Sequence, residues 1–135
     1  MIIFTKGDDQ VEKIEKDFLE LEDYLNKAIN YINENDFALD NELKKWNVKL
    51  SKEEIIKSLK LINNKVDNWI KNYNSKNDIL VIELKDYDLV SKESAFLLGE
   101  CSLIDGLYIE QIDWIIGLIG SYMAKEIKEG GKMNE

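Results

Sequence analysis

Hydrophobic side chains recur along residues 9–33 at alternating steps of three and four, which is the spacing of one face of an α-helix. The repeat consists of Val11, Ile14, Phe18, Leu21, Leu25, Ala28 and Ile32. Acidic residues surround it: Glu15, Asp17 and Glu22 flank the repeat, and Glu12, Glu20 and Asp23 point away from it. This three-heptad seam predicts one long amphipathic helix whose apolar face packs against other helices.

A second seam occupies the middle of the chain. It consists of Ile55, Leu59, Ile62, Val66, Trp69 and Tyr73. Ser51 and Glu54 precede it with the spacing of a capping box, in which each side chain bonds the other residue's backbone N–H. A shorter apolar pattern between Phe37 and Trp46 predicts a short helix that connects the two long ones.

The longest helix-compatible stretch is Ser91–Gly130, and it is apolar on nearly every side. A helix of that kind is normally buried, so we expect it to lie between the two seam-bearing helices. An alternative remains open, because Asp105-Gly106 could break the stretch into two helices, with Asp105 capping the second.

One strip of this stretch carries small residues at steps of mostly three and four. Its members are Ala95, Gly99, Ser102, Gly106, Asp113, Gly117, Gly120 and Ala124. Glycine costs about 1 kcal/mol relative to alanine inside a helix, so four glycines need a structural reason. We expect the strip to pack closely against a neighbouring helix. The alternative interpretation is that the strip lines a pocket for a small ligand.

Two short β-branched runs, 1–5 and 79–84, predict strands that could pair as a minimal ribbon supported by the helices. The predicted fold is therefore mainly α: an antiparallel helical bundle with a long buried C-terminal helix and this small ribbon. The length of 135 residues predicts a single domain spanning 1–135.

Charge is unevenly distributed within a net charge of −9. Residues 1–42 carry twelve acids and four lysines, residues 43–77 carry three acids and nine lysines, and residues 78–135 carry twelve acids and five lysines. All eighteen basic residues are lysines, and lysine, isoleucine and asparagine are abundant. That bias is typical of AT-rich bacterial or phage genomes.

The composition excludes several chemistries. With no histidine and only Cys101, the chain cannot build zinc sites of cysteine and histidine, or Ser-His and Cys-His nucleophile pairs. Cys101 lies among leucines and is interpreted as core packing. The apolar run 114–124 is too short to span a membrane, and the chain opens without a secretory signal pattern. We therefore expect a cytoplasmic protein without cofactor, metal or enzymatic activity.

Two groups of charged residues are candidates for binding. Glu110 and Asp113 are helical neighbours that could form a ligand or cation site through their carboxylate oxygens. The lysine-rich middle could form an anion-binding patch; its exposed candidates are Lys44, Lys45, Lys49, Lys52, Lys57, Lys60 and Lys71. The absence of arginine and the overall acidity argue against nucleic acid as the partner.

The acidic surface predicts a binding protein for a basic protein, such as a toxin, nuclease or defence effector. By analogy of size and charge, it would act like an immunity protein, an antitoxin or a phage anti-defence inhibitor, covering its partner's active site. The predicted contact residues are Glu12, Glu20, Asp23, Tyr24, Tyr31 and Trp46. Alternatives are an oligomer-forming structural protein whose seams pair between chains, and a small-ligand sensor using the glycine strip. The seams are compatible with a monomer or a homodimer.

Overall fold

The computed structural model describes residues 2–5, 9–74, 79–128 and 132–133. The elements in chain order are β1 (Ile2–Thr5), α1 (Asp9–Glu34), α2 (Asp36–Lys45), α3 (Lys52–Asn74), β2 (Ile79–Ile82), α4 (Leu84–Cys101), the 3-10 turn η1 (Asp105–Leu107), α5 (Ile109–Lys128) and β3 (Lys132–Met133). The predicted mainly α class is confirmed.

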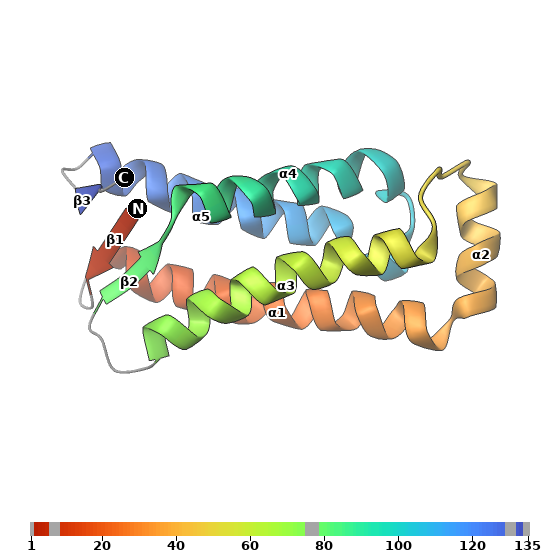
Figure 1. Cartoon of the computed structure of the whole chain (residues 1–135), viewed down its shortest axis with the longest axis horizontal. Helices are drawn as coiled ribbons and strands as arrows, with labels where there is room; N and C mark the ends of the chain where they lie inside the picture. Colours follow the sequence, from red (N-terminus) through yellow and green to blue (C-terminus); the bar gives the residue numbers. More distant parts are fainter. Residues whose placement is uncertain (1, 6–8, 75–78, 129–131, 134–135) are drawn as a thin grey trace.

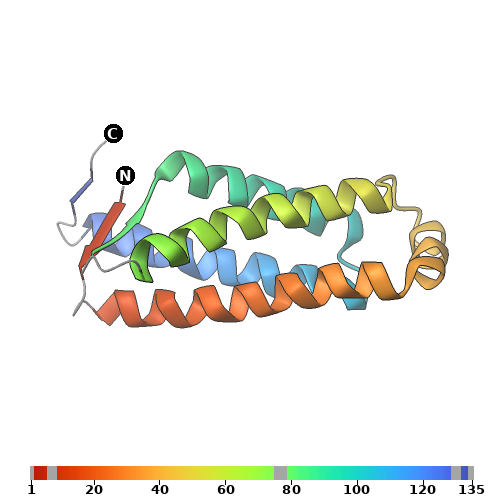
Figure 2. The ribbon, with the colours of Figure 1, turned by 60° about the horizontal axis from the view of Figure 1, so that its bottom comes forward.

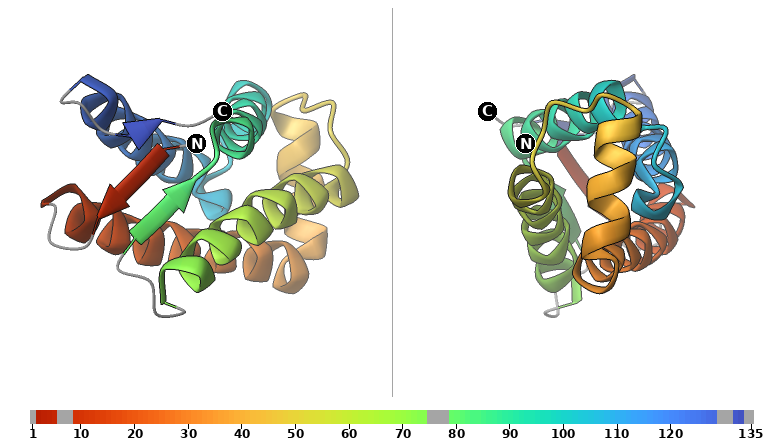
Figure 3. Two further views of the ribbon diagram at one scale, coloured as in Figure 1. Left: turned by 60° about the vertical axis from the view of Figure 1, so that its left-hand side comes forward. Right: turned by 90° about the vertical axis from the view of Figure 1, so that its right-hand side faces the viewer.

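The four long helices form an antiparallel bundle around one core (Figure 1). Helix α1 packs against α3 and α5, and α4 packs against the same two helices. Seen end-on, the short helix α2 crosses one end of the bundle (Figure 3). Each long helix therefore has an inner face in the core and an outer face that no other long helix covers.

Both predicted seams form the core of this bundle. Every seam residue of α1 is at most 3% exposed, and the seam of α3 is buried from Ile55 to Trp69. The rings of Phe18 and Trp69 stack with centroids 5.8 Å apart, which joins the two seams directly. The Ser51–Glu54 capping box is present: the Ser51 N–H donates to Glu54 Oε1 at 3.0 Å, and the Glu54 N–H donates to Ser51 Oγ at 3.1 Å.

The long apolar stretch is two helices and not one. Helix α4 begins at Leu84 and not at Ser91, because Leu84 and Tyr87 extend its core-facing stripe by two turns. It ends at Cys101, and α5 begins at Ile109 after η1. The break at Asp105-Gly106 is thus confirmed, but Asp105 opens η1, whereas the Tyr108 carbonyl accepts the Ile112 N–H at the start of α5.

The expectation that this stretch is buried on all sides is wrong. Phe96 is 48% exposed and Trp114 68%, because α4 and α5 are two sides of the bundle and not its centre; Leu103, in the turn after α4, is 58% exposed. The small-residue strip is also only partly a packing face. Backbone at Gly106 contacts the Tyr31 ring, and Gly120 lies against Tyr87, whereas a side chain at Gly117 would meet no atom within 4 Å.

The predicted ribbon forms at the end of the bundle opposite α2 (Figure 2). Strand β1 pairs antiparallel with β2, with Ile2 opposite Ile82 and Thr5 opposite Ile79. The two-residue strand β3 pairs antiparallel with the other edge of β1, giving the order β2-β1-β3. Leu80 and Ile82 of β2 are buried, so this sheet closes that end of the core.

Candidate functional site

A surface groove of about 410 Å³ runs between α1 and α5. Its lining residues are Glu20 and Tyr24 from α1, and Glu110, Gln111, Trp114 and Ile115 from α5. Glu20 and Tyr24 are four residues apart, as are Glu110 and Trp114, so each pair lies on one helical face. We call this feature the α1–α5 groove.

Trp114 is the most exposed aromatic residue lining this groove, with 68% of its surface accessible. Its neighbours Ile112, Ile115 and Ile116 are at most 3% exposed and fill the core. An exposed tryptophan between carboxylates has the composition of a protein-binding surface, where aromatic residues supply most of the binding energy.

A pair of tyrosines adjoins the groove. The rings of Tyr24 and Tyr108 lie 5.4 Å apart at an interplanar angle of 38°. The Lys27 ammonium lies 5.5 Å from the Tyr24 centroid and 5.9 Å from the Tyr108 centroid. It also pairs with Asp23 Oδ2 at 3.0 Å, and this hydrogen bond raises the pKa of Lys27. A cation is therefore already held on an aromatic surface here.

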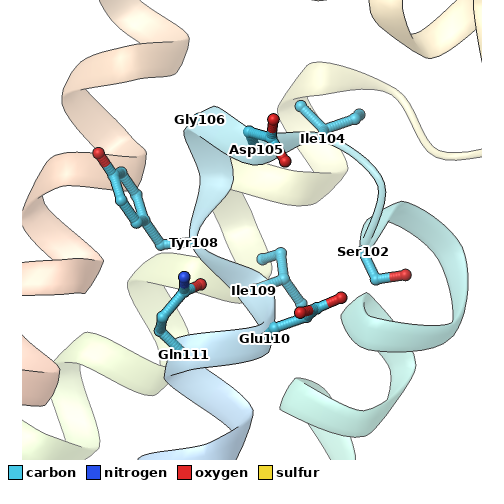
Figure 4. A pocket seen from close by; sticks show the side chains of 8 residues that line it. All are labelled: Ser102, Ile104, Asp105, Gly106, Tyr108, Ile109, Glu110 and Gln111. Carbon is cyan, nitrogen blue, oxygen red and sulfur yellow. The ribbon is translucent and has the colours of Figure 1, made fainter.

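A second hollow of about 360 Å³ continues from the groove around the connection between α4 and α5. It shares Glu110 and Gln111 with the groove, and Asp105 adds another carboxylate. Figure 4 shows Tyr108 pointing toward α1, whereas Glu110 points to the other side, toward Ser102. The two hollows thus make one continuous surface with carboxylates on both sides of Tyr108.

The predicted acidic residues of α1 divide between this groove and the open surface. Glu12, Glu20 and Asp23 are all exposed, as expected. Only Glu20 lines the groove, while Asp23 holds Lys27 beside it. Glu20 thus faces the groove and Asp23 contacts Lys27 beside it.

The three predicted aromatic contacts lie in different places. Tyr24 lines the groove. Tyr31 covers Gly106, so one of its faces is occupied by its own chain. Trp46, just after α2, is 41% exposed; its indole N–H donates to Glu42 at 2.9 Å, and the Lys45 ammonium lies 5.0 Å from its ring centroid. Tyr24 is thus the one of the three that lies beside the acids of α1 in this groove.

The predicted pair of Glu110 and Asp113 has different neighbours in the structure. Asp113 accepts a hydrogen bond of 2.8 Å from Ser94 Oγ on α4, whereas Glu110 is exposed beside the groove. Within the described part of the chain, no three carboxylates or thiols gather closely enough to hold a metal ion. Glu110 and Asp113 are three residues apart on α5, but Glu110 lines the groove and Asp113 faces Ser94 on α4.

Several lysines of the basic middle segment contact acids of neighbouring helices. Lys52 pairs with Asp36 and with Asp40 on α2, and Lys65 pairs with Asp86 on α4 at 3.1 Å. Lys71 pairs with Asp67 within α3 at 3.2 Å. These contacts reduce the positive charge that this segment offers to an anionic partner.

The sequence pattern did not identify Trp114, Tyr108 and Gln111 as residues that line the groove and the adjoining hollow. Trp114 belongs to the Ser91–Gly130 stretch that was expected to be buried, and that expectation holds only if one helical phase continues through Asp105-Gly106. If 109–123 is instead taken alone, Ile109, Ile112, Ile115, Ile116, Ile119 and Met123 define the buried face. Trp114 then falls opposite that face, which is the signal that could have identified it.

The remaining chemistry is restricted. Burial raises the pKa of the Cys101 thiol to about 11, and its Sγ contacts the Leu97 carbonyl at 3.2 Å, so it packs in the core as an unreactive thiol. Among the described helices, none has an apolar stretch long enough to cross a membrane.

No protein-family model, curated protein or solved structure matches this chain.

Proposed function

We propose that this protein binds a basic protein partner and blocks it by covering a cationic surface. The α1–α5 groove is the contact, and the observation that supports this proposal is the exposed Trp114 in a groove that Glu20 and Glu110 also line. Trp114 anchors the complex by burying its ring, while the carboxylates pair with lysine or arginine of the partner.

The charge of the whole chain favours such a partner. A net charge of −9 on 135 residues attracts cationic proteins over distance and speeds their encounter. Charges at the rim of a contact act mainly on the association rate, whereas the buried aromatic centre determines how long the complex lasts. The groove contains both kinds of residue.

The test begins with capture of a partner from the native host by the immobilised protein. Dissociation constants are then measured at two salt concentrations for single variants Glu12→Lys, Glu20→Lys and Asp23→Lys, and for Trp114→Ala. We expect Glu20→Lys to weaken binding most among the three charge variants, because it alone lines the groove. Trp114→Ala should raise Kd at least about tenfold, equivalent to ~1.4 kcal/mol.

Matched controls separate this surface from general acidity. Glu53→Lys changes an exposed acid on α3, and Phe96→Ala removes a half-exposed ring on α4. Both should bind as wild type and leave inhibition of the partner's activity unchanged. If Glu53→Lys weakens binding as much as Glu20→Lys, or if salt has no effect, the proposed contact is wrong.

A further inference from the structure

We infer that the Tyr24–Tyr108 pair is a cation-binding platform, that Lys27 occupies it in the free protein, and that an arginine of the partner replaces Lys27 there. This inference rests on the proposed function and adds the chemistry of recognition. It identifies a specific chemical group of the partner, a guanidinium, and a residue of this chain that competes with it.

The geometry of the platform supports the first part. Two aromatic faces tilted at 38° lie within 6 Å of one ammonium, at 5.5 and 5.9 Å. That is the distance range in which a cation is attracted by the electron-rich face of a ring. Asp23 supplies the countercharge at 3.0 Å, so ring faces and carboxylate together form the site.

The backbone holds Tyr108 in place. Its φ of 52° lies in the left-handed region, which residues with a Cβ rarely adopt. This conformation ends η1 and starts α5, and it points the Tyr108 ring toward α1 (Figure 4). The left-handed residue ends η1 as a C-cap, and by setting the direction in which α5 leaves, it fixes the Tyr108 ring against Tyr24.

Lys27 is held weakly enough to be replaced. The Lys27 and Asp23 side chains are 52% and 61% exposed, and they are four residues apart on one helix. Exposed pairs of this kind contribute little because water and salt screen them. A partner cation that buries the platform gains the same contacts in a drier environment, where they are stronger.

Arginine fits this surface better than lysine. Its planar guanidinium stacks on aromatic rings and at the same time presents paired N–H donors to a carboxylate. Tyr24 belongs both to the platform and to the groove lined by Glu20 and Trp114. An arginine placed over Tyr24 therefore has ring faces and the acids Asp23 and Glu20 around it.

The experiment titrates the ¹⁵N-labelled full chain with hexa-arginine and follows the three tryptophan indole signals. Trp114 reports on the groove, whereas Trp46 near α2 and the buried Trp69 are internal controls. We expect the Trp114 signal to shift, with smaller changes at the other two. Hexalysine at equal charge should bind more weakly.

The decisive variant is Lys27→Met, which removes the ammonium from the platform while keeping a side chain of similar length. It should tighten hexa-arginine binding about two- to fivefold, the size of an exposed cation–π contact. Lys92→Met on α4 removes the same charge from an exposed residue on another face, so any gain it shows measures charge alone. Tyr24→Phe should retain binding, whereas Tyr24→Leu should reduce it.

Three results would overturn the inference: Lys27→Met binding no tighter than Lys92→Met, Tyr24→Leu binding as well as Tyr24→Phe, or hexalysine binding as tightly as hexa-arginine. If these occur while the captured partner still depends on Glu20 and Trp114, the platform is wrong and the proposed function stands. If the platform behaves as expected but the captured partner ignores the Glu20 and Trp114 variants, the proposed function is wrong and the platform stands.

Discussion

Among the residues that the structure describes, Asp17 is the acidic residue that is buried. It lies beside the α1 seam, is 8% exposed, and one of its carboxylate oxygens has no hydrogen-bond partner. Burial raises its pKa, and a hydrogen bond from Tyr122 on α5 only partly opposes that rise. The sequence places three acids beside the seam, but it cannot show which of them a neighbouring helix covers, because that depends on the position of α5.

Replacing Asp17 by asparagine should stabilise the protein at neutral pH. The raised pKa means that the folded state binds the Asp17 proton more tightly than the unfolded state does. Stability from this group is therefore fully present below its ordinary pKa of 3.8, and it is lost as pH rises through the raised value. Asp17→Asn removes that loss, and we expect a gain of about 0.5–1 kcal/mol at pH 7.

Urea unfolding of wild type and Asp17→Asn at pH 7 and near pH 3.5 measures this difference. The gain should shrink at the lower pH, where the wild-type carboxyl is already protonated. Glu12→Gln removes an exposed acid of the same helix and should change stability by less than about 0.5 kcal/mol. An Asp17→Asn variant that is less stable than wild type at pH 7 would show that the folded protein stabilises the ionised Asp17 carboxylate.

At the scale of the element, α5 contains two glycines with opposite surroundings. Gly117 is exposed and has no atom within 4 Å of where a Cβ would lie. A Cβ at Gly120 would instead collide with the Tyr87 hydroxyl, which donates a hydrogen bond of 2.7 Å to the Ile116 carbonyl. A glycine is therefore required by close packing at position 120, whereas at position 117 the space would accept a side chain.

Alanine substitution at these two positions should shift stability in opposite directions. Gly117→Ala should stabilise by up to about 1 kcal/mol, because alanine favours the helix and nothing is displaced. Gly120→Ala should destabilise by roughly 1–3 kcal/mol, because Tyr87 must give up its position. The two denaturant midpoints test this, and equal shifts of the same sign would mean that helix propensity alone decides.

The sequence predicted the elements better than it predicted their faces. The seams of α1 and α3 were clear because each repeats over several turns without interruption, and β1 and β2 followed from short β-branched runs. The faces of α4 and α5 were not predictable in the same way. Residues 102–108 include the left-handed Tyr108, so the helical phase before the break says nothing about the phase after it.

The candidate site failed to emerge from the sequence for a related reason. Glu20 and Tyr24 were identifiable from α1 alone, because they lie outside a clear seam. Their partners Trp114 and Glu110 lie some ninety residues later on α5, and only the packing of α1 against α5 brings the four together. A site between two helices depends on which face each helix turns to the other. The sequence predicts that face for α1 but not for α5.

At the scale of the whole molecule, the two heptad seams are used within a single chain. Residues of the α1 and α3 seams such as Leu21, Leu25, Leu59 and Ile62 are completely buried in the bundle. A dimer that paired these seams between chains would first have to open the core. The repulsion between two chains that each carry a net charge of −9 also opposes their association, above all at low salt.

We therefore expect a monomer of 15.7 kDa in solution at every practical concentration. Sedimentation equilibrium at low and moderate salt measures this mass directly, with Trp114→Ala as the comparison because Trp114 is the largest exposed ring in the groove. A concentration-dependent mass that falls back to the monomer in Trp114→Ala would make the α1–α5 groove a self-contact. A dimer unaffected by Trp114→Ala and resistant to salt would instead restore the oligomer-forming interpretation, since an exchange of seam-bearing helices would then be the remaining explanation.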